Sequence, residues 1–334
     1  MGVRVSSRVR ENPIQDRSIL LQLPPQRKGL RERDIQSWTM QDMQERLPLK
    51  MIIIVPAARA VRHLEFSSGL ARDLGIPLLV LASGDCDPQL AALTADMVVE
   101  CGVPPEGNLP LLPGQVRRDL AAKRNLGLEI ARSLGFRYAL FLDDDISGVT
   151  PEGVSWAKRK LDSGHDAAGF HVTDFPDNSV VMHAARATGD HVPVHVSGGA
   201  VMMSTLRDWG ECPDVYGEDW FLLQGSRMAF PGPAVRQAPY DPFSPGRAAS
   251  EEAGDFLSER MRMPGAGILS ESWWGDQLIL RREFLAGIAA RTREPRILSS
   301  LAGAREVNSE ITPQILTGWV EAWLRTGKSS IPST

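Results

Sequence analysis

The stretch Tyr138-Ala-Leu-Phe-Leu-Asp-Asp-Asp145 joins a short apolar run to three consecutive carboxylates. A run of aromatic and aliphatic residues is typical of a buried parallel strand, and in open α/β sheets ligands bind beyond the carboxyl ends of such strands. Adjacent carboxylates repel one another unless a cation neutralises them, and their oxygens suit Mg²⁺ or Mn²⁺. The stretch therefore predicts an α/β fold with a metal site at the sheet edge; the alternative is an acidic turn or a helix cap.

The composition limits the classes of partner. The chain has 334 residues and is 43% hydrophobic, which is ample for a buried core. The formal net charge of −4 provides no general basic field, so we expect no nucleic-acid partner. Three widely spaced cysteines without a CxxC pair suggest neither a zinc site nor a disulfide framework, and favour a cytoplasmic location. No apolar stretch approaches the roughly 20 residues that span a bilayer, and we expect no cleaved signal peptide.

The pattern along the chain predicts alternating strands and helices. Residues 1–48 are polar and read as an N-terminal extension, with a helix over 31–46. A β-branched run at 49–55 predicts the first buried strand of the fold. A helix over 61–74 and a strand over 77–82 complete a βαβ unit. An amphipathic helix is predicted before the acidic strand, followed by further strands and by C-terminal helices: helix 117–134, strands 167–172, 191–196 and 200–203, and helices 248–263, 276–290 and 313–325.

The order of these features resembles the GT-A nucleotide-sugar glycosyltransferases, in particular the family 2-like group. The motifs that carry the resemblance are the strand at 52–55, the pair Arg124-Asn125, the segment Phe141-Leu-Asp-Asp-Asp-Ile146 and the segment Gly217-Glu-Asp-Trp220. The resemblance implies an α/β, Rossmann-like fold with a mixed, mainly parallel sheet flanked by helices and a C-terminal helical region. It also implies a nucleotide-sugar-binding and catalytic domain at 49–240, and a lid or helical acceptor region at 241–334.

By this resemblance, the acidic triplet is an Asp-x-Asp motif that holds Mn²⁺ or Mg²⁺ and the donor's ribose or diphosphate. Asp145 and Asp143 are then the metal candidates, with Asp145 the stronger, and Asp144 serves as an alternate donor-binding group. Such a site is needed because negative charge grows on the departing nucleoside diphosphate as the glycosidic bond breaks. The donor is expected to be a sugar linked to a nucleoside diphosphate, with uridine diphosphate as the first choice.

The pair Glu218-Asp219 is the predicted base that takes the proton of the acceptor, with Asp219 the usual residue for this role in the family. The alternative is a helix N-cap, where carboxylates favour the dipole, and the two roles can coexist. Other donor contacts implied by the resemblance come from the ends of the first two strands, from the helix before the acidic motif and from a glycine turn: Pro56, Ala57, Arg59, Asp85, Arg124, Gly198 and Gly199.

The resemblance thus predicts a metal-dependent glycosyltransferase that transfers a sugar to a hydroxyl or other nucleophile of a small-molecule, glycan or peptide acceptor. Inversion is the expected outcome, and retention is the alternative, because GT-A folds host both. A second enzyme class is the sugar nucleotidyltransferase, which normally opens with a glycine-rich loop; residues 56–63 contain no glycine. A third reading is a scaffold that binds nucleotide sugars without turnover. The sequence sets no expectation for the oligomeric state.

Overall fold

The computed structural model describes residues 19–20, 50–103, 109–175, 178–263 and 267–327. Apart from residues 19–20, the predicted N-terminal extension and its helix over 31–46 lie outside the described residues. Within the described ranges, no helix has the length and apolar character needed to cross a membrane.

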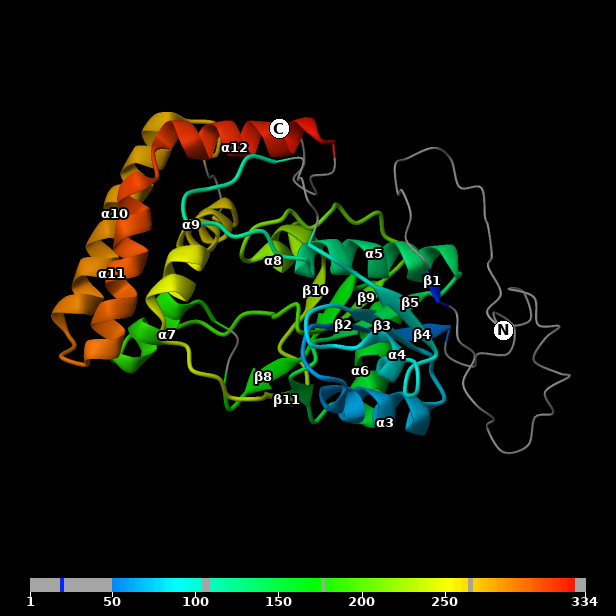
Figure 1. Cartoon of the computed structure of the whole chain (residues 1–334). Coiled ribbons are helices and arrows are strands. Elements are labelled where there is room, and N and C mark those ends of the chain that lie inside the picture. Colours follow the sequence, from blue (N-terminus) through cyan, green and yellow to red (C-terminus); the bar gives the residue numbers. More distant parts are fainter. Residues whose placement is uncertain (1–18, 21–49, 104–108, 176–177, 264–266, 328–334) are drawn as a thin grey trace, which may run out of the picture.

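A sheet of eight strands forms the centre of the molecule, in the order β1-β4-β3-β2-β5-β9-β7-β10 (Figure 1). The strands β4, β3, β2 and β5 run parallel, whereas β9 runs antiparallel to both of its neighbours, β5 and β7. The bounds are β1 (Ile19–Leu20), β2 (Met51–Ala57), β3 (Leu78–Ala82), β4 (Met97–Glu100), β5 (Tyr138–Leu142), β7 (Ala167–Gly169), β9 (Ala200–Ser204) and β10 (Met228–Ala229). A second sheet contains β6 (Ile146–Ser147), β11 (Ala234–Gln237) and β8 (His171–Thr173).

Helices cover both faces of the main sheet, which explains why its central strands are continuous apolar runs rather than alternating ones. Successive side chains of β2 point to opposite faces: Ile53 and Val55 join one core cluster, and Ile52 and Ile54 join the other. The first face carries α3 (Glu65–Leu74) and α6 (Pro151–Asp162), and the second carries α5 (Leu120–Ser133), as Figure 1 shows. Two short helices precede β4, namely η1 (Val61–Leu64) and α4 (Pro88–Ala91).

The C-terminal helices pack together beside the sheet (Figure 1). Their core includes the fully buried rings of Trp274, Trp319 and Phe256. Five of these helices begin with a capping side chain, and three of those five have proline at the first turn, which marks their starts in the sequence. The bounds are α7 (Val180–Ala187), α8 (Glu218–Leu223), α9 (Pro245–Met261), α10 (Glu271–Ala290), α11 (Pro295–Glu310) and α12 (Pro313–Arg325).

The predicted α/β fold class is confirmed: the chain has a mixed, mainly parallel sheet flanked by helices, with a helical C-terminal region. Two predicted strands differ in detail. Residues 191–196 form no strand, because Pro193 lacks the N–H that a strand ladder needs. Val192 is nevertheless buried and Val194 exposed, so the alternating pattern of the sequence reflects side-chain packing rather than strand pairing. The predicted strand at 167–172 is divided between the two sheets, as β7 and β8.

Candidate active site

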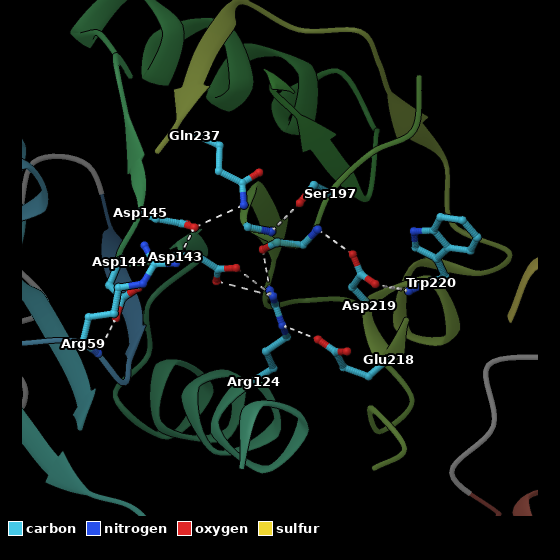
Figure 2. Close-up of polar contacts among 12 residues, drawn as sticks. Arg59, Arg124, Asp143, Asp144, Asp145, Ser197, Glu218, Asp219, Trp220 and Gln237 are labelled. Atoms are coloured by element: carbon cyan, nitrogen blue, oxygen red, sulfur yellow. Dashed lines mark hydrogen bonds and ion pairs between the residues drawn. The ribbon is translucent and has the colours of Figure 1, made fainter. Parts of the chain in front are cut away.

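The three consecutive aspartates follow β5, and their side chains point to three different sets of partners (Figure 2). Asp143 faces Arg124, whose Nη2 lies 3.3 Å from its Oδ2. Asp144 accepts hydrogen bonds of 2.9 Å from the backbone N–H groups of Ala58 and Arg59, and so ties the end of β2 to the end of β5. The mutual repulsion predicted for the triplet is therefore relieved in the protein itself, by arginines and by backbone donors.

Asp145 is the carboxylate of the triplet with an oxygen to spare. Its Oδ2 accepts from Nη2 of Arg59 at 2.9 Å and from Nε2 of Gln237 at 3.1 Å. Its Oδ1 has no hydrogen bond to any part of the chain that the structure describes. One free carboxylate oxygen beside a second aspartate is a set that Mg²⁺ or Mn²⁺ accepts when phosphate oxygens and waters complete the shell. These residues thus fit the predicted metal, although no cluster of three or more ligating side chains occurs within the described ranges.

Arg124 lies at the centre of the site and is 4% exposed. Its Nε donates to Oε1 of Glu218 at 3.0 Å, its Nη1 donates to the carbonyl of Gly198, and its Nη2 faces Asp143. Burial would lower the pKa of Arg124, but the charges of Asp143 and Glu218 outweigh it and raise that pKa above its ordinary value. Arg124 therefore stays charged, and it joins the acidic turn after β5 to the start of α8.

Glu218 and Asp219 begin α8, directly after Gly217, whose φ of 79° is the left-handed conformation that glycine adopts at no steric cost. Glu218 is buried, and this burial raises its pKa to about 7 in spite of the neighbouring Arg124. Oδ2 of Asp219 accepts from the N–H of Gly198 at 2.6 Å, and Oδ1 accepts from the N–H of Trp220 at 3.0 Å. The N-cap of α8 is Gly217 and no side chain caps the helix, so the two carboxylates do not act as caps; both lie in the first turn, where negative charge favours the helix dipole.

Gly198 and Gly199 are required by close packing. A Cβ on Gly198 would lie 2.6 Å from Nη1 of Arg124 and 2.6 Å from Cβ of Asp219. A Cβ on Gly199 would lie 3.0 Å from Oδ2 of Asp143. The glycine turn therefore packs closely against Asp143 on one side and against Arg124 and Asp219 on the other.

A cavity of about 420 Å³ connects these groups. Its lining includes Asp143 and Asp145 from the acidic turn, and Glu218 and Asp219 from α8. Arginines also line it: Arg59, Arg118, Arg124, Arg247 and Arg262. A cavity with convergent carboxylates and guanidinium groups suits an anionic ligand and proton transfer, and it lies at the carboxyl end of the parallel strands, where such sites occur.

Of the remaining residues predicted to bind the donor, only some line this cavity. Arg59 lines it, whereas Pro56, Ala57 and Asp85 are absent from the lining that the described residues form. Pro56 and Ala57 are buried in β2, and Asp85 is exposed beyond β3, with its N–H bonded to the carbonyl of Ala58. The predicted roles of all these residues in donor binding stay predictions.

Several lining residues were missed by the sequence analysis. Trp220 follows the acidic pair directly, and its ring is 5.0 Å from that of His195, whose pKa is lowered by burial. Arg262 lies at the end of α9, far along the chain, and packs on Trp220. Trp220 belongs to the segment Gly217-Glu-Asp-Trp220, which was a usable signal although no role was given to it; no local pattern marks Arg262, because its place depends on the path of α9.

No protein-family model matches the chain, and no curated protein matches it in sequence. Its structure is similar to that of a mycobacterial protein, with 18% identity, coverage of 70% of this chain and 81% of that one, and a TM-score of 0.43. Mannosyl-3-phosphoglycerate synthase from Rubrobacter xylanophilus has 11% identity, coverage of 69% and 82%, and a TM-score of 0.41. S. aureus TarS 1-349 in complex with UDP-GlcNAc has 13% identity, coverage of 78% and 90%, and a TM-score of 0.35. Similarities this weak assign no activity to the chain.

Proposed function

We propose that the protein is a nucleotide-sugar glycosyltransferase that acts by a single inverting displacement. The observation that supports this most is the shared cavity: the acidic turn after β5 and the acidic pair of α8 line one space, with Arg124 between them. One acidic group at a strand end suits a diphosphate with its cation, and a second, separate acidic group suits removal of a proton from an acceptor.

The donor end of the cavity is assigned to Asp143, Asp145 and Arg59. Oδ1 of Asp145 and the carboxylate of Asp143 would hold Mg²⁺ or Mn²⁺, which when bound neutralises charge on the leaving diphosphate. Arg59 is 40% exposed along its side chain, so its guanidinium is free to turn from Asp145 toward a phosphate oxygen. We assign uridine diphosphate as the nucleotide to test first.

The acceptor end is assigned to Asp219. Two backbone N–H groups hold its carboxylate in place, and it lines the cavity. The acceptor hydroxyl would pass its proton to Asp219 while its oxygen attacks the anomeric carbon opposite the departing diphosphate. Such assistance is worth about 10²–10⁴-fold in rate. Glu218 is the alternative base, because its pKa of about 7 suits proton transfer, but its bond to Arg124 makes it first a positioning residue.

The test is nucleotide binding by the full chain, measured by thermal shift and calorimetry with uridine, guanosine and thymidine diphosphates, each with Mg²⁺, Mn²⁺ or a chelator. We expect one diphosphate to stabilise the wild-type protein only with metal, because a ligand that binds the folded state alone raises its apparent stability. Asp145→Asn should abolish the metal-dependent part, and Asp73→Asn, at an exposed position of α3, should not. Equal binding by Asp145→Asn and wild type would contradict the metal site, and no binding of any diphosphate would overturn the proposed donor.

A further inference from the structure

Arg262 differs from the other arginines of the cavity in its partners. Arg59, Arg124 and Arg247 each form an ion pair with a carboxylate, and Arg118 donates to Ser250. The guanidinium of Arg262 has no hydrogen bond and no ion pair to any residue in the described ranges. A cation without a partner that lines a cavity is available to bind an anion.

The position of the Arg262 guanidinium is fixed by an aromatic ring rather than by a carboxylate. Its Cζ lies 3.4 Å from the centroid of the Trp220 ring. A guanidinium carbon this close to the centroid lies over the ring, and no N–H group of Arg262 is used in a hydrogen bond within the described ranges. The end of α9 that carries Arg262 is also anchored, since Nε2 of Gln224 donates to the carbonyl of Met261 at 3.0 Å.

The acidic side chains near Arg262 already have cationic or backbone partners. Asp255 lies 2.7 Å from Nη2 of Arg281, and Glu259 lies 3.6 Å from Nη1 of the same arginine. Asp219 accepts from two backbone N–H groups, as described above. The positive charge of Arg262 is therefore not matched by a carboxylate at contact distance, and an incoming anion would not have to displace one.

The position of Trp220 shows on which side of the cavity the Arg262 guanidinium lies. In Figure 2, Arg59, Asp144 and Asp145 lie on one side of Arg124, and Asp219 and Trp220 lie on the other. A group bound by Arg262 is thus next to the proposed base and away from the proposed diphosphate site. We propose that the acceptor is a small hydroxyl compound that carries an anionic group, a carboxylate or a phosphate. This group is bound by the guanidinium of Arg262, which itself lies over the ring of Trp220. That the bound compound is an acceptor rests on the proposed function, but the anion site at Arg262 does not.

The experiment compares three probes with similar hydroxyl groups, namely glycerol, glycerate and glycerol 3-phosphate. Calorimetry on the full chain, with and without uridine diphosphate and Mg²⁺, should show binding of glycerate, of glycerol 3-phosphate or of both, and weaker binding of glycerol. The two charged probes distinguish a carboxylate from a phosphate as the recognised group. Arg262→Gln should weaken binding of the preferred anion about 10- to 100-fold, as expected for loss of hydrogen bonds to a charged group.

Two further variants separate charge from geometry. Arg262→Lys keeps the charge but loses the planar fork, and should weaken binding by a smaller factor than Arg262→Gln. Arg260→Gln is the matched control, because Arg260 belongs to the same end of α9 but pairs with Glu259 and is absent from the described cavity lining. Equal binding of glycerol and both charged probes, or an unchanged anion affinity in Arg262→Gln, would overturn the anion site. Anion binding that depends on Arg262 in a protein that binds no nucleotide would support the site and overturn the proposed donor instead.

Discussion

Replacing Glu218 by glutamine should change how the stability of the protein depends on pH. Glu218 is 8% exposed, and burial raises its pKa to about 7 from an ordinary value of 4.5. Between these two values the folded chain keeps the proton on Glu218, whereas the unfolded chain has lost it. The free energy of unfolding therefore falls as the pH rises through this range, because the native state binds more protons than the unfolded state.

The size of the effect follows from the two pKa values. The interval from 4.5 to about 7 corresponds to a loss of about 3 kcal/mol, since one pKa unit is worth about 1.4 kcal/mol. The stabilisation is fully present below pH 4.5 and is lost by the time the pH has passed 7. Glutamine cannot ionise, so Glu218→Gln should not show this loss. The free energy of unfolding of the variant relative to wild type should thus rise by about 3 kcal/mol between pH 4.5 and pH 8.

The assay is urea unfolding of wild type and Glu218→Gln at half-unit steps across this range. The difference between the two proteins is the informative quantity, because titrating groups away from the site contribute equally to both and any constant cost of the substitution only shifts the curve. Glu129→Gln, at an exposed position of α5, is the control and should give a flat difference. A difference for Glu218→Gln that stays within about 1 kcal/mol from pH 4.5 to pH 8 would refute the conclusion that burial dominates over Arg124.

Two further substitutions test the rest of the site. Asp219→Asn should lower sugar transfer about 10²–10⁴-fold while calorimetry shows a diphosphate affinity close to that of wild type; unchanged transfer would remove Asp219 as the base. Gly198→Ala should lower sugar transfer sharply, because the added methyl group would lie 2.6 Å from Nη1 of Arg124 and 2.6 Å from Cβ of Asp219. Gly246→Ala is the control, because its methyl group enters open space and should leave transfer unchanged. Equal activity of the two variants would show that the glycine turn can move to accommodate the methyl group.

Much of the fold was predictable because burial on both faces leaves a clear pattern in the sequence. The predicted runs at 49–55 and 138–142 became central strands: β2, which starts after Lys50, is apolar at every position, and β5 is a buried aromatic and aliphatic run. The strand β4 and the helix α11 were not predicted. β4 has only three apolar residues, and the small and polar residues of α11 are buried by contacts with α9 that no local pattern specifies.

The residues of the candidate site also differ in how well the sequence alone predicts them. Asp143, Asp145, Glu218 and Asp219 lie in short acidic motifs, so the sequence alone was enough to single them out. That Arg124 would contact both motifs was not predictable, because its three partners come from β5, from the glycine turn and from α8. Their meeting is a property of the sheet order, in which antiparallel β9 places the glycine turn beside the carboxyl end of β5.

The charges of the cavity are divided unequally between its two ends. At the proposed donor end, Arg59 neutralises Asp145, so a diphosphate that attracts Arg59 would leave that carboxylate without its cationic partner. A divalent cation replaces the lost positive charge, which is why diphosphate and metal should bind together there. At the other end, Arg262 has no carboxylate partner in the described ranges, and an anion can bind it without a cation. A chelator should therefore weaken binding of the diphosphate and leave binding of the acceptor's anionic group intact.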